Sequence, residues 1–257
     1  MIELSLLLLL GFISGIAAGL LGIGGGIIMV PGLIFISALQ DPPQIISIHS
    51  AIGTSLGTII FTSIASARGH HLKNGVNYVV FRNLIIGLAL GALIGSAIAV
   101  SMSQQLLKQI VVIFLLIAGS RLFLKTKNFQ LASNLKFGNM SMHGTWIGTV
   151  SSILGIGGGT FIVPLLNAKG IAIRESIGTS AMCGIPIAIF GCFGFIALSK
   201  SGISEDYVIW SSALVMAISR ILGARYGVKL VYKIDQDSLK KIFGAFICIA
   251  AILLLIR

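Results

Sequence analysis

Charged side chains are scarce in this sequence. Only 10% of its 257 residues are Asp, Glu, Lys or Arg, whereas 56% are hydrophobic and the mean hydropathy is +1.04. A water-soluble domain carries about 25% charged residues, so the composition excludes a cytoplasmic enzyme. No stretch is long and polar enough to form a soluble domain, and we therefore predict a polytopic membrane protein that acts within the bilayer.

Acidic residues are the rarest charges, with seven Asp and Glu against 18 Lys and Arg. None of the seven falls in the middle of an apolar run. A cation transporter normally places a carboxylate at its site within the membrane, so this absence favours an anionic substrate. The net charge of +11 is scattered in short clusters between apolar runs, which is typical of membrane loops and not of a surface that binds nucleic acid.

The sequence offers no disulfide framework, metal site or enzyme motif. Its three cysteines all lie in apolar stretches, and its four histidines are not grouped with carboxylates, so we expect neither disulfides nor a cofactor. A match to G-x-S-x-G at residues 53–57 lacks the strand–turn–helix context of a hydrolase. No basic residue precedes the first apolar run, so we expect it to remain as a membrane segment and not to be cleaved as a signal peptide.

What the sequence does contain is an internal repeat. Residues 11–31 match residues 144–164 at an offset of 133, including the shared run GIGGG and the proline that follows it. The block IGTS at residues 52–55 recurs at residues 177–180, and a third glycine-containing block recurs later in each half at an offset of 132. Three matches in the same order indicate a duplication.

Each half contains five apolar segments. They lie at residues 4–21, 26–39, 45–67, 78–100 and 106–124, and at residues 144–154, 159–168, 176–198, 207–228 and 239–256. Because a spanning helix needs about 20 residues, we expect the short segments around each GIGGG run to form a returning helical hairpin. The predicted fold is an all-α polytopic membrane protein with two inverted-topology repeats, residues 1–124 and 144–257, joined by a basic cytoplasmic linker at 125–143. Each repeat is a glycine-rich helical hairpin plus three transmembrane helices.

The basic residues determine the predicted orientation. Three crossings per half invert the second half, which puts 15 of the 18 Lys and Arg residues on the cytoplasmic side and leaves Lys108, Lys200 and Arg257 outside. Parallel halves would divide the cations nine to nine, against the positive-inside rule. We predict inverted repeats of the kind found in secondary transporters, with both termini outside, in a bacterial plasma (inner) membrane.

The glycine runs are the main candidates for a binding site. Three consecutive glycines free backbone N–H groups from helical pairing, which is tolerated in a membrane only inside protein or beside an aqueous cavity. At the start of a helix such groups favour an anion, and a pseudo-two-fold would bring both runs into one pocket. Pro31 and Pro164 are expected to kink or end the short helix after each run.

The two Thr-Ser pairs of the IGTS blocks are further candidates. Their hydroxyls could donate to an oxyanion without the cost of burying a charge; the alternative is that they bond back to their own helices. The predicted substrate-binding residues are Gly22, Gly24, Gly25, Gly26, Thr54, Ser55, Gly155, Gly157, Gly158, Gly159, Thr179 and Ser180.

Two basic residues lie directly before these blocks in the sequence. His49 and Arg174 precede the two IGTS blocks at equivalent positions and are candidates for a vestibule that attracts anions. For Arg174 the alternative is to snorkel to the membrane interface, which we also expect of Arg220. His49 is the only titratable candidate near the predicted site if transport is coupled to a proton.

Two halves that each open with LGIGGG and VP, followed by a block A/S-I-G-T-S, resemble the TauE/SafE family of sulfite-exporter-like permeases. The resemblance covers essentially the whole chain and carries over to the glycine runs, the two prolines and the two Thr-Ser pairs. It implies transport of small sulfur-containing anions such as sulfite, thiosulfate or organosulfonates. No further motif selects sulfite among them.

These observations predict a secondary transporter that moves a small anion by alternating access of the inverted halves. Two alternatives stay open on the sequence: an anion channel on the same scaffold, and a non-transporting membrane assembly protein. The sequence gives neither the direction of transport nor the oligomeric state.

Overall fold

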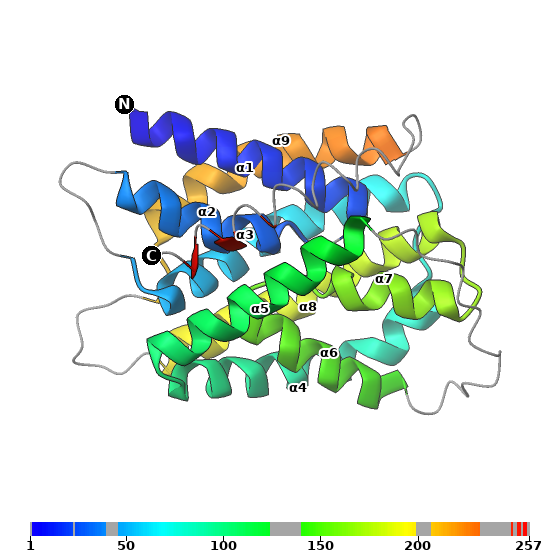
Figure 1. Ribbon diagram of the computed structural model, residues 1–257. Coiled ribbons are helices and arrows are strands. Elements are labelled where there is room, and N and C mark those ends of the chain that lie inside the picture. Colours follow the sequence, from blue (N-terminus) through cyan, green and yellow to red (C-terminus); the bar gives the residue numbers. More distant parts are fainter. Residues whose placement is uncertain are drawn as a thin grey trace.

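The computed structural model describes residues 2–22, 24–39, 46–123, 140–198 and 207–231, together with positions 248, 251, 252, 254 and 255. Over these residues the structure is all-helical (Figure 1), which confirms the predicted all-α class. The helices are α1 (Ile2–Leu21), α2 (Gly26–Ala38), α3 (Ile48–His71), α4 (Tyr78–Ser101), α5 (Gln104–Phe123), α6 (Met140–Leu154), α7 (Gly159–Ala168), α8 (Ile173–Leu198) and α9 (Trp210–Val231). Most of the predicted linker and of the last segment, 239–256, lies outside the described residues.

Polar caps fix the starts of the two long helices α3 and α4. The Ser50 amide donates to the Ser47 side chain at 3.1 Å, and the Val80 amide donates to Asn77 Oδ1 at 3.0 Å. Each cap satisfies an amide that has no partner within its helix. Both helices therefore begin within three residues of the predicted segments.

The helices differ in whether they can span a bilayer. Among the described residues, α1, α3, α4 and α8 are long and apolar enough to cross a membrane. The helices α2 and α7 have only 13 and 10 residues, too few to cross. In the first hairpin α1 is thus long enough to span the membrane and α2 is not, whereas the sequence suggested that both helices were too short.

Glycine faces bring two pairs of helices into close contact. A Cβ added at Gly15 of α1 would lie 2.4 Å from the Arg220 carbonyl oxygen of α9, and one added at Gly91 of α4 would lie 2.0 Å from the Thr145 oxygen of α6. Only glycine allows backbones to approach so closely. Figure 1 shows the α1–α9 pair and the α4–α6 pair on opposite sides of the molecule, with α3 and α8 between them.

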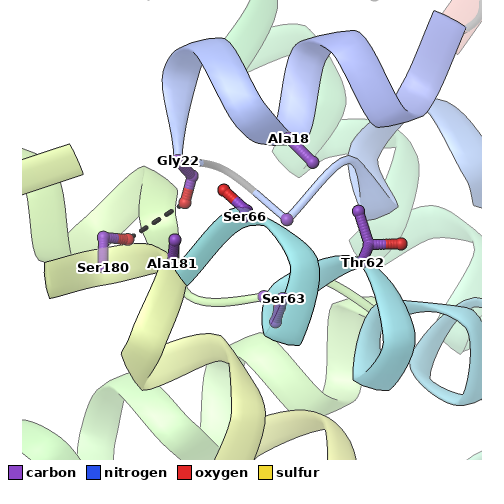
Figure 2. A pocket seen from close by; sticks show the side chains of 9 residues that line it. Ala18, Gly22, Thr62, Ser63, Ser66, Ser180 and Ala181 are labelled. Atoms are coloured by element: carbon purple, nitrogen blue, oxygen red, sulfur yellow. Dashed lines mark hydrogen bonds between the residues drawn. The ribbon is translucent and has the colours of Figure 1, made fainter. Parts of the chain in front are cut away.

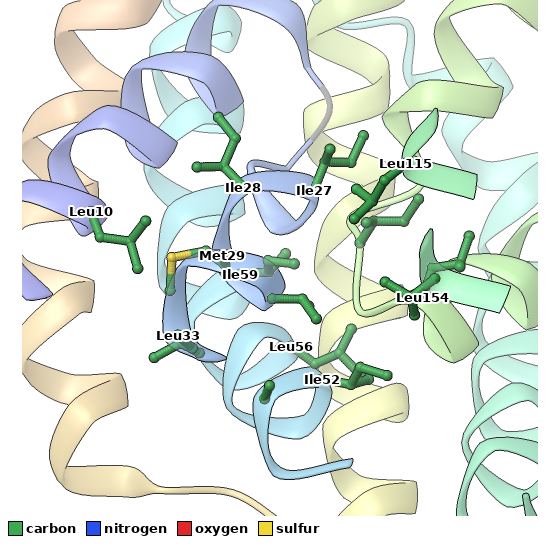
Figure 3. Packing of buried hydrophobic residues seen from close by; sticks show 14 of the residues in the cluster. Leu10, Ile27, Ile28, Met29, Leu33, Ile52, Leu56, Ile59, Leu115 and Leu154 are labelled. Atoms are coloured by element: carbon green, nitrogen blue, oxygen red, sulfur yellow. The ribbon is translucent and has the colours of Figure 1, made fainter. Parts of the chain in front are cut away.

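The helix α3 lies at the centre of the protein. Of the four candidate spans it has the largest buried share, 78%, against 44% to 56% for the others. Its residues Ile52, Leu56 and Ile59 pack into the main hydrophobic cluster with α2 and Leu154 (Figure 3). In contrast, large apolar side chains such as Ile86 of α4 are exposed, as expected of a surface that faces lipid. The protein is an integral membrane protein.

Candidate functional site

The two glycine runs meet through their backbones. Loop 1, residues 22–25, connects α1 to α2, and loop 2, residues 155–158, connects α6 to α7. A Cβ added at Gly24 would lie 2.7 Å from Gly157 Cα, and one added at Gly157 would lie 2.9 Å from Gly24 Cα. No side chain fits between the loops, so glycine is required at both positions.

The conformation of each loop also requires glycine. Gly22 and Gly25 have φ angles of 67° and 68°, and the matched Gly155 and Gly158 have 68° and 77°, a left-handed region that other residues rarely adopt. Gly25 and Gly158 are the N-caps of α2 and α7, without a side-chain cap. The remaining glycines of the runs, Gly26 and Gly159, begin those two helices.

The hydroxyls of the IGTS blocks bond across the two halves. Ser55 Oγ donates to the Gly155 carbonyl at 2.8 Å, and Ser180 Oγ donates to the Gly22 carbonyl at 3.0 Å. A serine has a single O–H donor, so in this conformation both donors position the opposite glycine loop.

The two threonines of the IGTS blocks anchor the starts of other helices. Thr54 Oγ1 accepts from the Ile209 amide at 2.9 Å, and Thr179 Oγ1 accepts from the Asn77 amide at 2.8 Å. These amides directly precede α9 and α4. In each IGTS block the serine therefore bonds to the opposite glycine loop, and the threonine bonds to the backbone just before another helix.

Arg220 is fully buried, which contradicts the expectation that it snorkels to the interface. Its side chain has 0% exposure; Nη2 donates to the Gly24 carbonyl of loop 1, and Nη1 donates to Thr58 Oγ1 of α3. Both acceptors are uncharged, and within the described part of the chain Arg220 forms no ion pair. The packing of α9 against α1 and α3 carries this guanidinium to the paired loops and away from the lipid surface.

A small pocket lies beside the paired loops (Figure 2). It is too narrow for a water molecule in this conformation, and it is lined by Gly22, Gly24 and Gly157 of the loops and by Thr62, Ser63 and Ser66 of α3. Ser180, bonded to the Gly22 carbonyl, forms part of its wall. The pocket therefore has backbone groups on one side and hydroxyls on the other.

The remaining candidates lie away from this pocket. His49 is buried, with Nε2 3.1 Å from the Ala99 carbonyl oxygen and its ring stacked on Tyr207, while Arg174 is exposed at the start of α8. Pro31 and Pro164 lie inside α2 and α7. Neither proline ends its helix, because α2 and α7 continue to Ala38 and Ala168.

Comparison with known proteins decides the family. The model of the family described as sulfite exporter TauE/SafE matches residues 7–254. This chain belongs to the TauE/SafE family. Within the family it is a membrane transporter and not an enzyme.

Curated relatives of this TauE/SafE chain are similar over their whole length. A protein of Haemophilus influenzae described as a probable membrane transporter is 32% identical over 253 residues, covering 96% of both chains. Relatives with the same description occur in Methanocaldococcus jannaschii, 29% identical with 98% and 96% of the two chains covered, and in Bacillus subtilis, 28% identical with 97% and 99% covered. No solved structure matches the chain.

The sequence interpretation of this TauE/SafE protein missed the polar face of α3. Thr58, Thr62 and Ser66 recur every four residues, a spacing that places them on one face of a helix, and this period was the available signal. One turn beyond Ser66, His70 is also fully buried, with Nε2 3.0 Å from the Gly19 carbonyl oxygen. The prediction that His49 is the titratable group near the site is therefore wrong, because His70 lies closer to the pocket along α3.

Proposed function

We propose that this TauE/SafE transporter carries small sulfur-containing anions of the sulfite, thiosulfate or organosulfonate class by alternating access. The observation that carries the proposal is Arg220, a guanidinium with 0% exposure and only neutral acceptors. Burying a charge without a counter-ion costs several kcal/mol. A bound anion offsets that cost, so a site of this kind selects anions over cations and over neutral solutes.

Two features support inverted repeats. The reciprocal bonds Ser55 to Gly155 and Ser180 to Gly22 have the pattern that a two-fold axis produces, in which each partner contributes the same group. The matched helices α3 and α8 run antiparallel, because Cβ atoms added at Gly184 and Gly191 would approach Ser63 and Leu56 respectively. A two-fold that relates antiparallel helices is perpendicular to them and therefore lies in the membrane plane.

The helix pairs agree with the same topology. Along α1, Gly11 faces Met216 and Gly19 faces Ala224, so α1 and α9 run in the same direction. If the basic residues face the cytoplasm, α9 enters from outside towards Arg225, and α1 then begins outside. This supports a plasma membrane protein with an external N-terminus and a cytoplasmic linker.

The contacts between the IGTS serines and the opposite glycine loops are weak enough to exchange during transport, whereas the α1–α9 and α4–α6 pairs, which also join the two halves, are packed at glycines. Each hydrogen bond between a serine and the opposite loop contributes only about 1 kcal/mol net, and the loop contact itself consists of backbone atoms without interlocking side chains. In the proposed cycle the α1–α9 pair and the α4–α6 pair, each built from one helix of each inverted half, rock about the loop contact, and the anion is exposed to one side of the membrane at a time.

The test is counterflow in proteoliposomes that contain the purified full chain. Liposomes loaded with unlabelled sulfite and diluted into trace radiolabelled sulfite should accumulate label transiently above equilibrium, with saturable dependence on sulfite; thiosulfate and a short alkylsulfonate are measured in the same way. Protein-free liposomes are the control. A flux that does not saturate with sulfite and shows no counterflow would establish a channel instead. If none of these anions moves under any gradient, the proposed substrate class is wrong.

A further inference from the structure

Most hydroxyls that line the pocket beside the glycine loops belong to α3, because Ser180 of α8 already donates to the Gly22 carbonyl. At an offset of 125, the residues of α8 that match Thr62, Ser63 and Ser66 of α3 are Ile187, Ala188 and Gly191. These three are apolar or lack a side chain. Because α8 forms the matching half of the core without these hydroxyls, the fold itself does not require them on α3.

The positive charge is on the same side. At an offset of 132, the residue that matches Arg220 is Leu88, which is buried in a hydrophobic cluster with Ile187. Arg220 donates to Thr58, one helical turn before Thr62, and to the carbonyl of Gly24, which lines the pocket. The guanidinium therefore lies about one helical turn from the pocket, close enough to neutralise an anion there.

Ser66 provides an uncommitted hydroxyl in this pocket. Its side chain is 1% exposed, and Oγ has no hydrogen-bond partner among the described residues. Figure 2 shows the Ser66 side chain between α3 and Gly22, among the residues that line the pocket. A buried hydroxyl without a partner is unfavourable, and an oxygen atom of a ligand in the pocket would satisfy it.

We infer that this pocket binds the oxyanion head group of the substrate when the two loops move apart during transport, with the Ser66 hydroxyl donating to it and Arg220 supplying the compensating charge. The inference rests on the proposed function and narrows it, because it places the anion on the α3 side of the loop contact and not on the pseudo-two-fold. Ser63 and the loop backbones complete the site. The two serines of the IGTS blocks hold the loops in place.

The test compares Ser66→Ala with Ser152→Ala in the purified full chain. Ser152 is a matched control, because its Oγ is also buried without a partner in the described structure but does not line the pocket. Thermal unfolding in detergent is measured against increasing sulfite and, separately, methanesulfonate, and counterflow gives KM for each. Ser63→Ala serves as a second pocket variant should Ser66→Ala fail to fold.

Loss of the Ser66 hydroxyl should raise KM, and the sulfite concentration that gives half of the thermal shift, about tenfold, because a hydrogen bond to a charged group is lost. Ser152→Ala should leave both within twofold. If the wild-type protein transports these anions and both Ser66→Ala and Ser63→Ala keep the wild-type KM, the pocket is not the binding site, although the proposed function still holds. A wild-type protein that neither transports nor is stabilised by either anion would overturn both, whereas an anion-dependent shift that Ser66→Ala abolishes would support the pocket even without transport. An effect with only one of the two anions would identify which head group the pocket accepts.

Discussion

Replacing Arg220 with methionine should separate the stability of the protein from its binding of anions. In the substrate-free protein the change removes a fully buried charge whose acceptors are the neutral groups of Gly24 and Thr58. The hydroxyl of Thr58 keeps its own bond to the Ser55 carbonyl at 2.7 Å. Only the Gly24 carbonyl loses a partner outright.

The magnitudes of these effects oppose each other. An unsatisfied buried carbonyl costs about 1–3 kcal/mol, whereas removal of an uncompensated buried charge recovers several kcal/mol of desolvation. The free energy of unfolding of substrate-free Arg220→Met should therefore be unchanged or raised, by up to about 3 kcal/mol. Anion binding should lose about 2–3 kcal/mol, the attraction between two unit charges about one helical turn apart at an effective dielectric constant of about 20, which weakens affinity by about 30-fold to 150-fold.

The assay is thermal unfolding in detergent with and without sulfite, combined with counterflow in liposomes. Wild-type protein should gain stability with sulfite, and Arg220→Met should need about 30-fold to 150-fold more sulfite for the same gain. Arg220→Lys is the control, because it keeps the charge but not the planar guanidinium that reaches two acceptors, and it should bind with intermediate affinity. Sulfite that stabilises Arg220→Met as much as wild type, or a substrate-free Arg220→Met that is strongly destabilised, would show that the arginine is structural.

Three further predictions concern the loops and the topology. Gly170→Ala should lower the free energy of unfolding by about 1 kcal/mol, because its φ of 82° is strained for alanine but nothing lies within 4 Å of the added Cβ. Gly24→Ala should lower it by the same strain plus about 1–3 kcal/mol more for the overlap with the other loop, and it should abolish transport. Equal unfolding midpoints for the two variants would contradict the loop contact. Ser55→Ala should destabilise by about 1 kcal/mol through loss of its 2.8 Å bond across the halves, a loss that Ser55→Thr should partly restore in chemical denaturation. In a Cys248→Ala background, Ser103→Cys should react with a membrane-impermeant maleimide in intact cells and Leu72→Cys only after permeabilisation; the reverse pattern would contradict the predicted orientation.

Hydrophobicity and the repeat predicted most of the fold. The apolar runs located α1 to α9 within a few residues, because the length of an apolar run and its polar ends are local properties that the surroundings alter little. The match between residues 11–31 and 144–164 also predicted two equivalent glycine loops. The contact between Gly24 and Gly157 agrees with the expectation that these loops come together.

The roles of the IGTS hydroxyls could not be derived from the sequence. Two alternatives were considered, a bond to substrate and a bond back to the same helix, and the structure shows a third, in which Ser55 and Ser180 bond to the opposite glycine loop. Partners separated by 100 and 158 residues are selected by how the halves pack. No local spacing encodes that choice.

The sequence by itself determined the class of the protein, the positions of its helices and the presence of two glycine loops, since each follows from composition, run length or repetition. Only the tertiary structure decided where the polar groups of the site lie. Arg220 lies in the middle of α9 (Trp210–Val231), whereas the sequence suggested a position near the end of its apolar segment from which it could reach the membrane interface. Packing of α9 on α1, at glycines that admit no side chain, leaves the guanidinium no path to water and directs it to loop 1. The position of Arg220 beside α3 and loop 1 follows from that packing, because a buried charged side chain can bond only to the partners that the surrounding helices provide.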